Sequence, residues 1–383
     1  MIYLDHNATT PLASEASEAM KPLLFGRFGN PSSSHTVGRE AAKIVENARE
    51  ETAELLGAAS TEEIVFTSGG TESDNWALAG AVRGNERRSH IIISAVEHEA
   101  VRNMGKRLAR EGHDLTVLSV NEEGLLDLDE LRRSLCADTA IVSVMHANNE
   151  TGVIFPVSEI SNVVKANSNA LFHVDGVNAA GKIKIDLKNT AIDLYSISAH
   201  KFYGPKGIGA LYIRKGIDLM PFLVGGGQER GRRAGTEAVH QAAGMGAAAR
   251  VVSDLSSMPA VSELRDKLEN ELLEKIPNSR LNGTAEPSMR LPNTSNISFE
   301  NVNGEMIMAR LDELGICVST GSACSTIDHK ASPVLEAMEV PYSYAMGSIR
   351  FSLGRTNNSQ EVEAVSAKMP ELIASLRKLS GNA

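Results

Sequence analysis

The stretch that decides the fold begins with His173-Val-Asp-Gly-Val-Asn-Ala-Ala-Gly-Lys182 and ends with Ser196-Ile-Ser-Ala-His-Lys-Phe-Tyr-Gly-Pro-Lys-Gly-Ile-Gly209. Asp175 ends one predicted buried strand, and Lys201 follows the next predicted strand, residues 194–198. In α/β proteins the strand ends are where the sheet presents its chemistry. The segment therefore predicts a sheet edge that carries a carboxylate and an amine.

An aspartate that pairs with a protonated ring nitrogen and a lysine that forms a Schiff base are the two groups that pyridoxal phosphate requires. Ser198 and His200 lie beside the lysine as candidate hydrogen-bond donors to the phosphate. Taken alone, Asp175 is about as often a turn cap, and most lysines are solvated. Lys201 follows an apolar strand and precedes the rigid turn Gly204-Pro-Lys-Gly207, which favours the functional interpretation.

Strand-like and helical segments alternate along the first two thirds of the chain. Strands are predicted at residues 64–67, 91–94, 115–118, 140–145, 171–175, 194–198 and 209–213, and helices at 36–56, 71–82, 99–111, 128–135 and 157–166. This order predicts βαβ units and an α/β fold, with a mainly parallel seven-stranded sheet that has helices on both faces.

The pattern changes near residue 255, where a smaller α+β domain is predicted. Its elements are helices at 261–275, 305–314 and 360–379 and strands at 296–299, 317–319 and 348–352. We expect a large domain over residues 15–255 and a small domain formed by residues 1–14 and 256–383, the latter carrying a loop at about 319–333.

Composition excludes several classes of protein. The 383 residues are 42% hydrophobic and 22% charged, enough for two domains and a large core. The net charge of -10 argues against nucleic acid as a partner. No apolar run approaches the roughly 20 residues of a membrane span, and the N-terminus does not resemble a signal peptide. We expect no membrane association and a cytoplasmic location. Three cysteines predict no disulfide framework.

A glycine-rich turn follows the first predicted strand of the sheet. Residues 64–67 run into Ser68-Gly-Gly-Thr-Glu72, which opens a helix. Such a turn aims free N–H groups at an anion, although a simple tight turn is an equal alternative. The spacing is neither that of a dinucleotide fingerprint nor that of a P-loop.

Two further side chains are candidates for chemistry. His98 follows a strand and can stack on a ring, although a loop histidine is more often only solvated. Arg102 stands where a zinc protease has its second histidine, which excludes that chemistry. Cys324 lies in a stretch of small polar residues that predicts an exposed loop, so it is either a thiolate nucleophile near His329 or Lys330 or an incidental surface cysteine.

Together these motifs resemble the cysteine desulfurases of the NifS/IscS type, in the class-V aminotransferase family of fold-type-I pyridoxal-phosphate enzymes. The resemblance covers nearly the whole chain. It rests on Tyr3-Leu-Asp-His-Asn-Ala-Thr-Thr-Pro11, Gly29-Asn-Pro-Ser-Ser33, Ser68-Gly-Gly-Thr-Glu-Ser-Asp-Asn75, Glu97-His98, His146-Ala-Asn-Asn-Glu150, Ser198–Lys201, Gly225–Thr236, Gly321-Ser-Ala-Cys324 and Ile349–Arg355.

The resemblance implies a role for each matched residue in holding the cofactor. Lys201 is implied as the Schiff-base lysine that also moves the Cα proton, His98 as the stacking group and Asp175 as the partner of the ring nitrogen. The implied phosphate ligands are Gly70, Thr71, Ser198 and His200, with Thr236 reaching the phosphate of the other subunit of a homodimer.

The resemblance also implies the reaction. Asn149, placed beside the cofactor, and Arg350 are implied to hold the carboxylate of the substrate, L-cysteine. Cys324 is implied to take the sulfur as a persulfide, with L-alanine as the other product, and to pass it to an iron–sulfur scaffold or another acceptor protein. Cys324 is also a candidate transient ligand of an iron–sulfur cluster.

One position departs from the family pattern. The family usually has a glutamine three residues after the aspartate, hydrogen-bonded to the phenolic oxygen of the cofactor ring, and here that residue is Asn178. Its amide is shorter by one C–C bond, roughly 1.5 Å. We expect altered activity or cofactor affinity rather than an altered fold.

Three alternatives stay open at this point. A selenocysteine lyase or a class-V transaminase would use the same cofactor, and a non-catalytic sulfur or iron–sulfur assembly hub would use Cys324 only for docking. Nitrogenase-dedicated and general cluster assembly share these motifs, so the acceptor is open too.

Overall fold

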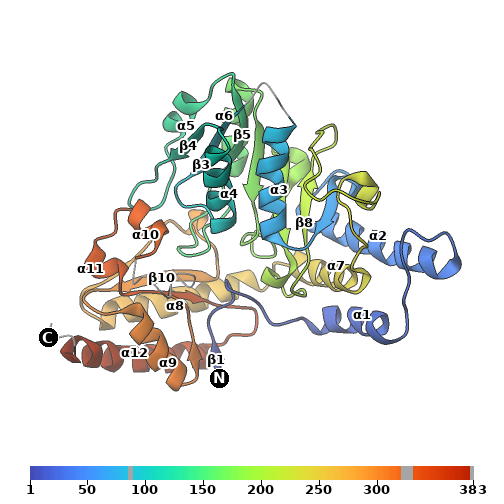
Figure 1. Ribbon diagram of the computed structural model, residues 1–383. Coiled ribbons are helices and arrows are strands. Elements are labelled where there is room, and N and C mark those ends of the chain that lie inside the picture. The colour runs from blue at the N-terminus through green and yellow to red at the C-terminus, as the bar shows by residue number, and fades with distance from the viewer. Residues whose placement is uncertain (85–88, 321–330, 380–383) are drawn as a thin grey trace.

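The computed structural model describes residues 1–84, 89–320 and 331–379. Its largest element is a seven-stranded sheet of order β2-β8-β7-β6-β5-β3-β4 (Figure 1). The strands are β2 (Ile64–Thr67), β3 (His90–Ser94), β4 (Leu115–Leu118), β5 (Thr139–Ser143), β6 (Leu171–Asp175), β7 (Leu194–Ser198) and β8 (Gly209–Ile213). Only β8 runs antiparallel to its neighbours, so the predicted, mainly parallel seven-stranded sheet is confirmed.

Helices cover both faces of this sheet (Figure 1). The helices of this part are α1 (Ser14–Phe25), α2 (Thr36–Leu56), α3 (Gly70–Arg83), α4 (Glu99–Arg110), α5 (Leu128–Ser134), α6 (Val157–Asn167) and α7 (Val239–Ser253), with 3-10 turns η1 (Thr61–Glu63), η2 (Leu187–Asn189), η3 (Ala199–Lys201) and η4 (Glu229–Gly231). Because strand residues alternate in direction, Ile91 and Ile93 pack with α3 and α4, while Ile92 packs in the core on the opposite face.

The predicted strand at residues 140–145 differs from the observed one. In the structure β5 begins one residue earlier and ends at Ser143. The backbone nevertheless continues beside β6, because the N–H groups of Val144 and His146 donate to the carbonyls of His173 and Asp175. This extension carries residues 146–150 to the carboxyl edge of the sheet.

Helices α1 and α7 were not predicted from the sequence. α7 is rich in alanine and glycine and is packed between α1 and α2, so it shows no polar face with a helical period. A side chain at Gly246 would begin 2.7 Å from Ala48, which explains the small residue there.

The remaining elements are arranged around a smaller sheet. They are β9 (Ser279–Leu281), β10 (Thr294–Phe299) and β12 (Ser348–Ser352) in one antiparallel sheet, β1 (Ile2–Tyr3) paired with β11 (Ile316–Cys317), helices α8 (Met258–Lys275), α9 (Gly304–Glu313), α10 (Pro333–Ala337), α11 (Tyr342–Ala345) and α12 (Ser359–Leu379), and the 3-10 turn η5 (Pro287–Met289). Leu4 belongs to the core of this part together with residues from α8, α9 and α12. The division into residues 15–255 and residues 1–14 with 256–383 stays a prediction.

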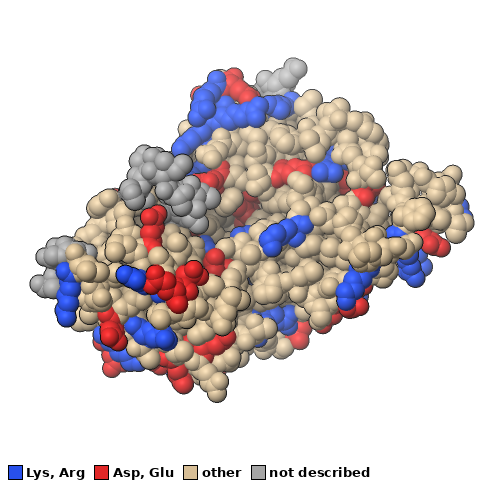
Figure 2. Space-filling model, turned by 60° about the horizontal axis from the view of Figure 1, so that its bottom comes forward, with Lys and Arg blue, Asp and Glu red and all other residues tan. Residues whose placement is uncertain are grey.

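The surface gives two further observations. None of the helices that the structure describes combines the length and the apolar composition needed to cross a membrane. On the face shown in Figure 2, acidic and basic side chains both occur, and several basic side chains gather along its upper edge.

A buried ion pair ties α2 to β2 and η4. Arg49 donates from Nη1 and Nη2 to the two carboxylate oxygens of Glu229, at 2.8 and 3.0 Å. The same carboxylate accepts from the backbone N–H of Phe66 at 3.0 Å. Both side chains are buried, so each charge depends on the other.

We therefore predict that Glu229→Ala lowers the free energy of unfolding by about 3–5 kcal/mol, because the buried Arg49 charge loses its buried partner and keeps only the more exposed Glu46. Urea unfolding of the purified protein measures this. Glu46→Ala is the matched control: Glu46 also pairs with Arg49, but it is 41% exposed, so its loss should cost less than about 1 kcal/mol. Equal costs for the two variants would contradict the prediction.

Candidate active site

A cavity of about 460 Å³ opens at the carboxyl edge of the large sheet. It is lined by ten of the residues singled out from the sequence: Gly70, Thr71, His98, Asn149, Asp175, Asn178, Ser198, His200, Lys201 and Arg350. Arg350 comes from β12, and Asn7 and Ala8 come from the N-terminal segment. The cavity is thus assembled from the large sheet, the small sheet and the first residues of the chain.

Lys201 lies in the turn η3, directly after β7. Its Nζ donates to the backbone oxygens of Asn7 and Ala8, at 2.5 and 3.1 Å. Burial and the nearby Arg350 guanidinium lower the pKa of Lys201 to about 8, against the opposing effect of Asp175. An amine with such a pKa has an appreciable neutral fraction near neutral pH and is able to act as a nucleophile or a base.

Asp175 ends β6 and is buried beside a second carboxyl group, Asp74 of α3. Ligating atoms of Asp74, His98 and Asp175 all lie within 4.8 Å of one another. Burial and the Asp175 carboxylate raise the pKa of Asp74 well above its ordinary value. Burial also raises the pKa of Asp175, but His98, the Val177 N–H and Lys201 oppose that rise. Of the two, Asp74 has the more strongly raised pKa, and Asp175 is the one that nearby positive groups and an N–H stabilise as a carboxylate.

An anion site is formed by the start of α3 and the end of β7. The backbone N–H groups of Gly70 and Thr71 have no acceptor among the described residues, as expected for the first turn of a 14-residue helix. The Ser198 and His200 side chains line the same cavity. Burial and the charge of Lys201 lower the pKa of His200 to about 4, so its neutral ring can donate one N–H at pH 7.

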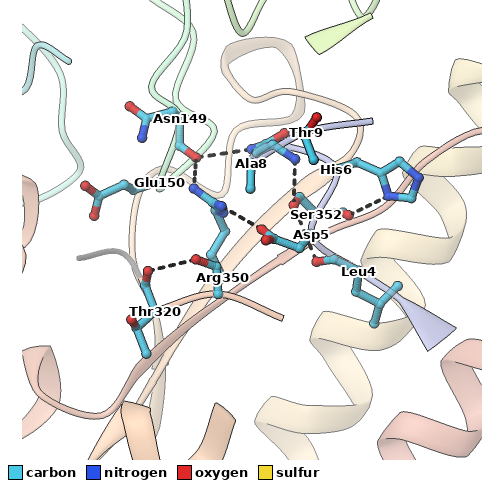
Figure 3. A network of polar contacts seen from close by, with 12 residues as sticks. Leu4, Asp5, His6, Ala8, Thr9, Asn149, Glu150, Thr320, Arg350 and Ser352 are labelled. Atoms are coloured by element: carbon cyan, nitrogen blue, oxygen red, sulfur yellow. Dashed lines mark hydrogen bonds and ion pairs between the residues drawn. The ribbon is translucent and has the colours of Figure 1, made fainter. Parts of the chain in front are cut away.

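Arg350 is held by groups from two distant segments (Figure 3). Its Nη2 lies 2.7 Å from Oδ1 of Asp5, and its Nη1 donates to the backbone oxygen of Asn149 at 3.0 Å. Asn7 donates from Nδ2 to the same Asn149 oxygen at 3.2 Å. These bonds leave the guanidinium fixed at the wall of the cavity, next to the side chain of Asn149.

Asn178 also reaches the cavity, from the turn that follows β6. Its side chain is buried, and its Oδ1 accepts a hydrogen bond from Nζ of Lys182 at 3.1 Å. Asn178, the residue at which the sequence departs from the family pattern, is therefore part of the cavity wall.

Two predicted residues are not brought to this cavity by the described chain. Thr236 is exposed and does not line it. Cys324 and most of its predicted loop lie outside the described residues. The nearest described residues on the far side of that segment, Ala331 and Pro333, do line the cavity.

Sequence reasoning missed several groups at the site. Asn7, Asp74 and Glu150 line the cavity, and Asp5 orients Arg350. Asp5, Asn7, Asp74 and Glu150 all stand inside motifs that carried the family resemblance, which was the available signal. Asp74 lies in a helix where an acidic residue is unremarkable, so only the structure reveals its place beside Asp175.

A parallel sheet with an aspartate, a lysine and an anion site at its carboxyl edge defines a class of cofactor-dependent enzyme, and the comparisons identify it. The "Aminotransferase class-V" family model matches residues 2–365, and the chain belongs to this family. Its members are pyridoxal-phosphate enzymes.

Similar proteins place the chain in one group of the family. A cysteine desulfurase from Trichormus azollae is 49% identical over 382 residues, covering 99% of this chain and 94% of the relative. A solved "NifS-like protein" has a TM-score of 0.91 and 38% identity, covering 98% of this chain and 100% of that one. "SspA in complex with cysteine" has a TM-score of 0.81 and 34% identity, covering 92% and 99%. The predicted fold-type-I enzyme class and the resemblance to NifS-type cysteine desulfurases are confirmed.

The low pKa of Lys201 predicts a pH-dependent stability in the cofactor-free protein. The unfolded chain holds this proton up to the ordinary pKa of 10.5, whereas folded Lys201 releases it near 8. Between these values the unfolded state binds more protons, so the free energy of unfolding of the wild type rises with pH relative to that of Lys201→Met, by up to about 3 kcal/mol.

Urea unfolding at several pH values measures the difference. The control is Lys206→Met, which removes an exposed lysine of the following turn and should give a curve parallel to that of the wild type. A wild-type minus Lys201→Met difference that stays constant from pH 8 to 10.5 would refute the assignment.

Proposed function

We propose that this protein is a cysteine desulfurase: it removes sulfur from L-cysteine with the help of pyridoxal phosphate, releases L-alanine and keeps the sulfur as a persulfide on Cys324 for acceptors that assemble iron–sulfur clusters. The observation that carries the proposal is the single cavity that joins Lys201, Asp175, the anion site and Arg350. The names of its relatives support it over the whole chain.

The residues of the cavity fit the cofactor. The free N–H groups of Gly70 and Thr71, with Ser198 and His200, suit a phosphate, and the carboxyl group of Asp175 suits a protonated ring nitrogen. His98 lines the same cavity and suits stacking against the ring. When bound, pyridoxal phosphate supplies an electron-withdrawing ring that stabilises negative charge at Cα of an amino acid.

The chain's own residues perform the remaining tasks. Arg350, fixed by Asp5, and the Asn149 amide hold the substrate carboxylate and so orient the Cα–H bond. Lys201 takes the Cα proton, for which an amine with a pKa of about 8 is suited.

The sulfur step belongs to Cys324. Its thiolate forms an S–S bond with the substrate sulfur as the Cβ–S bond breaks, and the electron pair of the broken bond is balanced by a proton taken up on the carbon that becomes the methyl group of alanine. The persulfide then passes to an acceptor. The proposal also includes transient ligation of an iron–sulfur cluster by Cys324.

A homodimer belongs to the proposal as well. Thr236 is exposed in the single chain, where it is free to contribute to the phosphate site of a second subunit. Large apolar side chains are exposed at the end of α1 and just after it, with Phe25 89% exposed and Phe28 83% exposed. Neighbouring exposed apolar side chains of this size are suited to a subunit interface. We place the enzyme in the cytoplasm.

The proposal predicts that Cys324→Ala lowers the turnover of L-cysteine to alanine and sulfide at least tenfold, because no thiolate takes the sulfur. Alanine and sulfide are measured on the holoprotein with a thiol reductant. Cys136→Ala, which removes an exposed cysteine remote from the cavity, is the control and should behave as the wild type. Wild-type turnover in Cys324→Ala would exclude this role, and keto-acid formation in place of alanine would identify a transaminase.

Arg350→Met should lower kcat/KM for L-cysteine by about 10- to 100-fold, because a charge-assisted hydrogen bond to the substrate carboxylate is lost. Steady-state kinetics on the holoprotein measures it. The matched control is Arg355→Met: Arg355 belongs to the same sequence motif, but it donates to Ser257 and to the Val251 carbonyl, away from the cavity. Equal losses in both variants would contradict the assignment.

A further inference from the structure

Lys182 is a buried lysine whose hydrogen bonds both go to one residue. Its side chain is packed inside the protein, with 7% of the residue exposed. Nζ donates to the backbone oxygen of Asn178 at 2.9 Å and to Oδ1 of the same residue at 3.1 Å. No carboxylate of the described chain lies within ion-pair distance of it. The two oxygens of Asn178 are therefore what replaces water around this amine.

The turn after β6 imposes this pairing. The N–H groups of Ala179 and Ala180 both donate to the Gly176 carbonyl, and the N–H of Lys182 donates to the Ala179 carbonyl. This succession of tight turns folds the chain back, so that the Lys182 side chain reaches Asn178. Gly181 has a φ of +74°, and a side chain there would begin 2.9 Å from Val252, so the turn ends in a conformation that glycine favours.

The bond to Lys182 decides how the Asn178 amide is oriented. The amine has protons for both oxygens in either of its charge states, and in the structure it donates one to the backbone oxygen and one to Oδ1. Oδ1 is thus turned toward Lys182. Nδ2 has no acceptor within residues 1–84, 89–320 and 331–379, and Asn178 lines the cavity that also holds Asp175 and Lys201. The free donor of the amide is left for a ligand in that cavity.

We propose that Lys182 is a positioning residue: it holds the Asn178 amide with its oxygen turned away from the cofactor and its NH₂ group available as a hydrogen-bond donor to the phenolic oxygen of the cofactor ring. This inference rests on the proposed function. In this inference Lys182, which is not one of the proposed catalytic residues, fixes the orientation of the Asn178 amide, which is shorter than the family's glutamine.

A direct effect of charge is the competing explanation, because a buried ammonium near the cofactor would also stabilise an ionised phenolic oxygen. Burial, with Lys201 and Arg350 adding to it, lowers the pKa of Lys182 well below its ordinary value, which weakens that explanation. The two explanations separate cleanly. Positioning acts only through Asn178, whereas a charge effect persists when Asn178 is replaced.

The experiment is a pH titration of the visible absorption band of the holoprotein, loaded with pyridoxal phosphate, for the wild type, Asn178→Leu, Lys182→Met and the double variant. Loss of a donor to the ionised oxygen raises the apparent pKa of the band. We expect each single variant to raise it by about half a unit to one unit, and the double variant to raise it no further.

Lys182→Gln serves as the rescue variant, because it keeps a donor for Oδ1 without a buried charge, and its band should titrate close to that of the wild type. The inference is overturned if Lys182→Met leaves the titration unchanged while Asn178→Leu moves it, or if Lys182→Met still shifts it in the Asn178→Leu background. Should Lys182→Met not fold, a shift in Lys182→Gln as large as that of Asn178→Leu overturns it instead. A wild type without a visible band in excess cofactor would overturn the proposed function itself, and this inference with it.

Discussion

The parallel pairing of β6 with β7 is the constraint on which the site depends. Asp175 lies opposite Ser196, two residues before β7 ends and the turn to Lys201 begins. A slip of one residue would turn every side chain of a strand to the other face. The residue after Asp175 leaves no room for such a slip, because a side chain at Gly176 would begin 1.9 Å from the ring of Tyr195. The carboxylate and the amine therefore meet at one edge only in this pairing.

Burial of charge explains the electrostatics of the cavity. Burial raises the pKa of Glu97 to about 8 and that of Glu150 to about 7, against hydrogen bonds that favour their ionised forms. These carboxyl groups therefore hold their protons through much of the neutral range, while Arg350 keeps its positive charge. The cavity thus carries less negative charge than its composition suggests, which suits the two anionic groups that the proposed function brings to it: a phosphate and a carboxylate.

A hydrogen bond also links the cavity to α10. The Ser332 hydroxyl donates to Oε2 of Glu150 at 2.5 Å, and the same hydroxyl accepts from the N–H of Val334 as the N-cap of α10. Helix α10, which begins at Pro333, is therefore anchored to a wall of the cavity. Loss of that anchor would change the position of α10 at the cavity wall without touching Lys201 or Asp175.

The sequence was sufficient for those parts of the site that local patterns encode. Asp175, Lys201 and the glycine-rich start of α3 all stand at strand ends, and strand ends are visible as the points where apolar runs stop. The rest depends on contacts between distant residues. Asp5 meets Arg350 only because β1 pairs with β11 and the following residue lies beside β12, and no local pattern contains that pairing. Asp74 was hidden in the same way, since it lies on α3 and its neighbour Asp175 ends β6. Helix α7 was missed because its surroundings are apolar on nearly every side.

Asn178 departs from the family pattern, and in the structure its side chain is hydrogen-bonded to a second residue, Lys182. In the sequence it is one amide that is shorter than the family's by a single bond. In the structure its oxygen is the only side-chain acceptor, among the described residues, for a buried amine, so the orientation of the amide and the burial of the lysine stabilise each other. A substitution at 178 that removed this oxygen would leave the amine with one backbone acceptor, and a substitution at 182 would free the amide to rotate. The two positions are therefore constrained as a pair. Lys182 compensates for the shorter side chain of Asn178 by holding its amide in one orientation, not by extending it further toward the cofactor.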